Sequence, residues 1–95
     1  MIIETPYKSG DTVTIKTLTD EIVARLVEET DTTVKVHKPM AIVATQQGIG
    51  LGPFAFTLNP DTDVVLSKAL VLMIAKTEKD MASQYTQSTT GIQMA

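Results

Sequence analysis

The chain of 95 residues contains no cysteine and no tryptophan, and aromatic residues make up only 4% of it. Without cysteine the protein can form no disulfide, no thiolate nucleophile and no cysteine-based zinc site. Hydrophobic residues make up 43% of the chain, so a core is possible. Because aromatic residues are few, this core must be built from Val, Ile, Leu and Met. Such a core is small, and small domains often gain stability by forming oligomers. We therefore expect one domain over residues 1–95.

Positive charge is scarce as well. The chain has 8 Lys and Arg against 11 Asp and Glu, which gives a formal net charge of -3. Proteins that bind nucleic acid usually carry a basic surface, so the overall balance disfavours that class. The first residues lack the features of a signal peptide, and the apolar run 69–75 is shorter than the roughly 20 residues of a membrane span. We expect a cytoplasmic protein with no membrane contact.

The first half of the chain has the pattern of a β-meander. Alternating apolar residues predict strands at about 12–18, 22–28 and 33–37, the last continuing toward 44. Short strands joined by tight turns pair antiparallel, because parallel strands need long crossovers. Pro39 cannot donate a ladder hydrogen bond and predicts a bulge, a bend or an edge. The pattern therefore predicts a strongly bent antiparallel sheet.

Residues 45–53 are polar and rich in glycine, and they contain no ionisable side chain. No helix start and no lysine follow, so we interpret this stretch as a mobile connector and not as a phosphate-binding loop. Residues 54–58 alternate again and predict a further strand.

Residues 64–75 are almost entirely apolar and predict a pair of strands that is covered on both faces. A domain of this size has difficulty covering both faces by itself, so the second face needs a helix or another subunit. We therefore assign an oligomer interface to this segment, with these candidate residues: Val64, Leu66, Leu70 and Leu72.

The C-terminal part predicts a helix at about 78–89, which ends before Gly91. Thr77 is the expected N-cap, and acidic residues follow it in the first turn. Met81 and Tyr85 lie one helical turn apart and form the expected docking face. So short a helix is marginal alone and must pack against the rest of the domain.

No arrangement of residues indicates catalysis. His37 is the single histidine, and a catalytic triad or a metal site needs partners at defined geometry. The carboxylates fall mainly at predicted turns, where Asp and Glu are common for local reasons. We expect no enzyme activity, no metal and no cofactor.

One local group of cations remains a candidate for contacts with RNA. Lys35, His37 and Lys38 lie close together, and Lys35 and His37 share one face of a strand. No aromatic residue accompanies them for base stacking, so a solvated strand face is the favoured interpretation.

The order of elements resembles the Sm-like small β-barrel of the LSm and Hfq ring proteins over about residues 10–75. The second motif of that family resembles residues 64–74, and the chain is also similar to short uncharacterised proteins of phages that infect marine cyanobacteria. The first motif matches these residues: Gly10, Val13, Ile15, Leu26, Asp31, Val34, Lys35 and Val36.

The resemblance implies a mainly β fold, an Sm-like five-stranded barrel with a C-terminal helix added. It also implies a homo-oligomeric ring of five to seven subunits, in which the fourth strand of one subunit pairs with the fifth strand of the next. The family's base pocket is incomplete here, because no Asn follows Asp31 and residues 66–69 lack an Arg-Gly pair. We therefore expect a phage-related assembly or protein-interaction scaffold. The alternative is an RNA or single-stranded nucleic-acid binding module, with weak binding through phosphate contacts.

Overall fold

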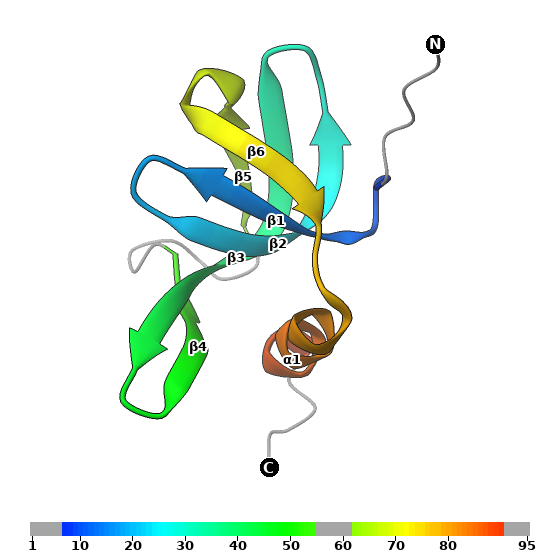
Figure 1. Ribbon diagram of the computed structural model, residues 1–95. Coiled ribbons are helices and arrows are strands. Elements are labelled where there is room, and N and C mark those ends of the chain that lie inside the picture. The colour runs from blue at the N-terminus through cyan, green and yellow to red at the C-terminus, as the bar shows by residue number, and fades with distance from the viewer. Residues whose placement is uncertain (1–6, 55–61, 91–95) are drawn as a thin grey trace, which may run out of the picture.

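The computed structural model describes residues 7–54 and 62–90 (Figure 1). It is an antiparallel sheet with one short 3₁₀ turn and one C-terminal helix. The elements in chain order are β1 (Thr12–Thr17), β2 (Glu21–Glu29), β3 (Thr33–Thr45), β4 (Gly48–Pro53), β5 (Asp63–Ser67), η1 (Lys68–Leu70), β6 (Val71–Lys76) and α1 (Lys79–Thr90). The predicted meander and the two strands predicted over 64–75 are confirmed, but within the described residues these two strands do not pair with each other and one of their faces is exposed.

The sheet follows the order β4-β3-β2-β1-β6, and β5 also pairs with β3. Strand β3 has 13 residues and pairs with two different strands along one of its sides. Its first part pairs with β5 from Thr33 to His37, and its second part pairs with β4 from Met40 to Thr45. Within the described residues no ladder joins β5 to β6, so the sheet remains open and has six strands, where the sequence predicts a five-stranded barrel.

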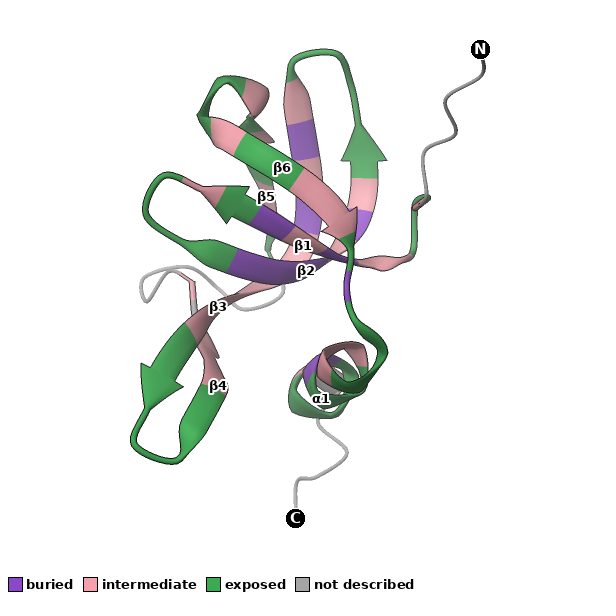
Figure 2. Cartoon of the chain, in the orientation of Figure 1, coloured by how far each residue is buried: buried purple, intermediate pink, exposed green. Residues whose placement is uncertain are grey.

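The core lies inside the bend of this sheet. Alternate residues of β1, β2 and β3 point to the same side and are almost fully buried, as the purple segments of Figure 2 show. The core residues are Val13, Ile15, Ile22, Ala24, Leu26, Val34 and Val36. Half-buried residues of the later strands, such as Val64 and Ile74, pack against them. The core therefore consists of small aliphatic side chains, as the composition predicts.

Residues 48–53 are the clearest departure from the sequence prediction. They form strand β4, which pairs with β3 in a continuous register from Thr45↔Gly48 to Met40↔Pro53. Gln46 and Gln47 make the turn, and the hairpin extends away from the body of the domain (Figure 1). The prediction of a connector without regular structure was wrong, because the apolar residues between the glycines supply a strand pattern. The strand predicted at 54–58 lies outside the described residues except for Phe54.

The ladder between β2 and β3 changes register where Pro39 stands. Arg25 pairs with His37, but Val23 pairs with Met40, so β3 contains one extra residue there. Lys38 has φ 52°, a left-handed conformation that few residues other than glycine adopt. The bulge predicted from Pro39 is confirmed.

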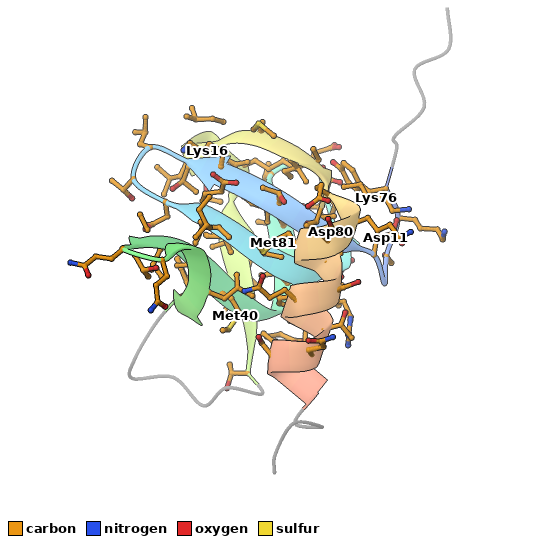
Figure 3. The ribbon with its side chains drawn as sticks, turned by 60° about the horizontal axis from the view of Figure 1, so that its bottom comes forward. Asp11, Lys16, Met40, Lys76, Asp80 and Met81 are labelled. Carbon is orange, nitrogen blue, oxygen red and sulfur yellow. The ribbon has the colours of Figure 1, made fainter. Side chains whose placement is uncertain are left out.

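Helix α1 covers the outer side of β2. Tyr85 and Val23 are both 1% exposed, so the predicted docking through Tyr85 is confirmed, while Met81 is half-buried (Figure 3). The predicted N-cap was wrong. The carboxylate of Glu78 accepts hydrogen bonds from the N–H groups of Asp80 and Met81 at 2.8 and 3.1 Å. The hydroxyl of Thr77 instead lies 2.9 Å from that of Thr14, since the chain still runs beside β1 at this point.

Candidate interaction surface

Two strands that follow each other in the chain leave unpaired edges. Strand β5 pairs only with β3, and β6 pairs only with β1, within the described residues. Large apolar side chains are exposed on these strands and on the turn between them. We call this group the edge patch, and it consists of Val65 (59% exposed), Leu70 (61%), Leu72 (62%) and Met73 (48%). An open strand edge with exposed apolar side chains favours pairing with another chain.

The 3₁₀ turn that carries Leu70 is fixed in place by several polar contacts. The Ser67 hydroxyl accepts a hydrogen bond from the N–H of Ala69 at 3.3 Å. The Lys68 ammonium lies 2.7 Å from a carboxylate oxygen of Glu29, and its backbone N–H donates to the carbonyl of Thr32. An ion pair of this exposure contributes only about 0–1 kcal/mol. Its value here is geometric, because it holds the turn against the β2–β3 connection while Leu70 points outward.

The four interface candidates from the sequence divide into two pairs. Val64 and Leu66 are half-buried and pack against the core of their own subunit. Leu70 and Leu72 are exposed. The sequence did not single out Val65 and Met73, which share the exposure of Leu70. Strict alternation along β5, with Val64 and Leu66 inward, was the signal that assigns Val65 to the outer face.

A groove of about 320 Å³ lies where the β1–β2 turn approaches η1. Its polar residues come mainly from the β1–β2 turn. Its apolar residues are Leu18, Ile22, Phe54, Leu66, Leu70 and Val71. Leu70 belongs both to the groove and to the edge patch, so the two form one continuous apolar surface at the open side of the sheet.

Two of the three residues proposed for RNA contacts, His37 and Lys38, have polar partners within the protein. His37 Nδ1 lies 2.5 Å from a carboxylate oxygen of Asp63, its neighbour on β5. The Lys38 ammonium donates a hydrogen bond to the carbonyl oxygen of Thr89 at 2.8 Å, near the end of α1. That position suits a cation because carbonyl groups at a helix C-terminus carry partial negative charge. Lys35 is half-buried between Glu28 on β2 and Val65 on β5.

Tyr85 holds the bulge in the β2–β3 ladder together. Its hydroxyl accepts a hydrogen bond from the N–H of Arg25 at 3.1 Å and lies 2.9 Å from the carbonyl oxygens of both His37 and Lys38. Burial raises the pKa of the Tyr85 hydroxyl above its usual value of 10.0, against the lowering effect of its contacts with Arg25 and Thr89. The sequence predicted that this ring is buried, but not that its hydroxyl completes the sheet.

The described residues contain no group of three or more His, Asp or Glu side chains arranged to hold a metal ion. They also contain no helix of the length and hydrophobicity that crossing a membrane requires.

The sequence matches no model of a protein family and no curated protein.

Proposed function

We propose that the protein is a non-enzymatic Sm-like assembly protein, whose copies join through the free edges of β5 and β6. The observation that carries this proposal is the edge patch, which places Val65, Leu70, Leu72 and Met73 in solvent beside two unpaired strand edges. The order of strands also supports it, since β5, a short 3₁₀ turn and β6 follow the meander and flank it on both sides.

Pairing of β5 in one subunit with β6 in the next uses two different surfaces. Such a head-to-tail contact repeats around an axis and closes into a ring when the rotation permits. It removes the open edges of β5 and β6 in every subunit and covers the edge patch. The ring then presents the outer helix face and the β3–β4 hairpin of each copy, which is the geometry of a scaffold for other proteins. On the basis of the sequence resemblance to phage proteins, we propose that the protein has this role in a phage-infected cell.

The engagement of His37 with Asp63 and of Lys38 with Thr89 favours a scaffold over an RNA-binding module. Contacts with phosphate would compete with these internal partners, and the net charge of -3 per chain opposes approach of a polyanion.

Multi-angle light scattering and native mass spectrometry of the whole chain test the proposal. We expect rings of five to seven chains of 10.3 kDa each, so the measured mass should be that of one ring or a whole multiple of it. Leu72→Lys places a charge in the edge patch and should dissociate this species, while circular dichroism remains that of a folded sheet. Gln87→Lys is the matched control, because it adds the same charge on an exposed position of α1. A monomer for the unmodified protein at micromolar concentration would refute the proposal.

A further inference from the structure

Besides the edges of β5 and β6, the β3–β4 hairpin has an unpaired edge within the described residues, and no charged side chain protects it against pairing. Among residues 7–54 and 62–90, strand β4 is the terminal strand of the sheet and pairs only with β3. Natural proteins protect such edges with charged residues, most often lysine. Here the sequence contains no charged residue and no histidine between Lys38 and Asp61. Ile49, near the tip, is 64% exposed.

The register of the hairpin shows which backbone groups face outward. The turn of Gln46 and Gln47 has two residues, so its flanking pair Thr45↔Gly48 exchanges hydrogen bonds. Alternation then directs the N–H and C=O groups of Gly50 and Gly52 toward β3. Those of Ile49 and Leu51 point to the free edge, where the described residues offer them no hydrogen-bond partner. The backbone of Pro53 also faces this edge, so its lack of an N–H group removes no hydrogen bond to β3.

We propose that β4 pairs antiparallel with β4 of a second copy of this chain about a two-fold axis at Gly50. Ile49 of one copy then exchanges both backbone hydrogen bonds with Leu51 of the other, and the symmetry repeats the exchange. Gly48 faces Gly52, and Gly50 faces its own equivalent. The apolar side chains of Ile49 and Leu51 gather on one face of the joined sheet, and the glycines lie together on the other face.

Among the neighbouring registers, only the axis at Gly50 places both Ile49 and Leu51 in pairs that exchange two hydrogen bonds. A two-fold axis at Leu51 sets Ile49 against Pro53, which has no N–H to donate. An axis at Ile49 sets Leu51 against Gln47, which lies in the turn and not in the strand. The uncharged edge also favours a second copy as the occupant, because no like charges oppose each other although the whole chain is negative.

A single cysteine tests this register in a chain that has none of its own. In Gly50→Cys the two thiols belong to a non-hydrogen-bonded antiparallel pair with Cα atoms about 4.5 Å apart, within the range of a disulfide. Space exists for the side chain, since the nearest atom to an added Cβ is a Val43 methyl group at 4.0 Å. We expect copper-phenanthroline oxidation to yield a band of twice the chain mass on a non-reducing gel.

Gly52→Cys is the matched control, since its Cβ also has ordinary contacts, but the proposed register sets it opposite Gly48. Its cross-linked fraction should be at least about tenfold lower, because thiols whose Cα atoms lie more than about 7 Å apart are not bridged. Adding Ile49→Lys to Gly50→Cys should abolish the cross-link. Adding Leu72→Lys should leave it intact, which separates this contact from assembly through β5 and β6. Equal cross-linking of Gly50→Cys and Gly52→Cys, or none by a folded Gly50→Cys protein, would overturn the proposal.

Discussion

The hydroxyl of Tyr85 accepts a hydrogen bond from the backbone N–H of Arg25 at 3.1 Å, across 60 positions of the chain. This contact joins the C-terminal helix to the second strand, at the point where the β2–β3 ladder changes register. A buried N–H that loses its strand partner at a bulge needs another acceptor. The tyrosine supplies it and also donates its proton toward the carbonyls of His37 and Lys38.

Tyr85→Phe should therefore lower the free energy of unfolding by about 1–3 kcal/mol, because it leaves buried backbone groups without a partner while keeping the ring. Urea denaturation monitored by circular dichroism measures the change. Tyr7→Phe is the control, since within the described residues the Tyr7 hydroxyl makes one hydrogen bond, an exposed one to Glu29 at 3.4 Å. Equal effects of the two variants would contradict the role given to Tyr85.

The raised pKa of Tyr85 predicts a loss of stability at high pH. The unfolded chain releases the tyrosine proton near pH 10, whereas the folded protein retains it to higher pH. Stability is thus fully present below pH 10 and declines as the pH rises through the folded-state value. Unfolding free energies measured from pH 9 upward should decline more steeply for the unmodified protein than for Tyr85→Phe. Parallel curves would show that Tyr85 does not contribute to this loss.

Glu78 should control the start of α1. Its two accepted backbone hydrogen bonds lower the pKa of the carboxyl group below its usual value of 4.5. The cap therefore contributes stability above pH 4.5 and loses it as the pH falls through the folded-state value. Glu78→Ala should reduce helix content at pH 7, and circular dichroism measures it. Glu78→Asp retains a capping carboxylate and should keep most of the helix signal. An unchanged helix signal in Glu78→Ala would argue against the cap.

The Thr14 and Thr77 hydroxyls should show a coupling energy. Either single substitution to Val leaves one half-buried hydroxyl without its partner at 2.9 Å. Replacing both removes the unsatisfied group, so the double variant should be more stable than the sum of the single effects by about 0.5–1.5 kcal/mol. A double-mutant cycle in urea measures this value. Strict additivity would mean that the two hydroxyls act independently.

RNA binding should be absent or weak at physiological salt. Mobility-shift assays with oligo-U and oligo-A at low and moderate salt measure it, and any shift seen at low salt should vanish as salt rises. Lys35→Ala and Lys38→Ala should reduce such a shift. Tight and sequence-selective binding that is unaffected by these two substitutions would restore nucleic-acid binding as the leading function.

The sequence predicted well those features that depend on local pattern. Alternation predicted the strands β1 to β3, and Pro39 marked the bulge because it cannot donate a ladder bond. The pattern at 48–53 was misread because glycine at every second position resembles a flexible loop, while the pairing of these residues depends on β3. The partners of Thr77 and the hydroxyl of Tyr85 lie more than 45 positions away, so no local pattern could reveal them.

Strand β3 is shared between two partners on one side, and the point of division is Lys38, with its left-handed φ of 52°. The direction in which the β3–β4 hairpin leaves the domain is set at this residue. The Tyr85 hydroxyl donates to the carbonyl oxygen of Lys38, and the Lys38 ammonium group donates to the carbonyl oxygen of Thr89. Through these two contacts α1 holds the corner of the hairpin in position. Removal of the helix would therefore change the direction in which the β3–β4 hairpin and its β4 edge leave the domain. The aliphatic core beneath the other strands would remain in place.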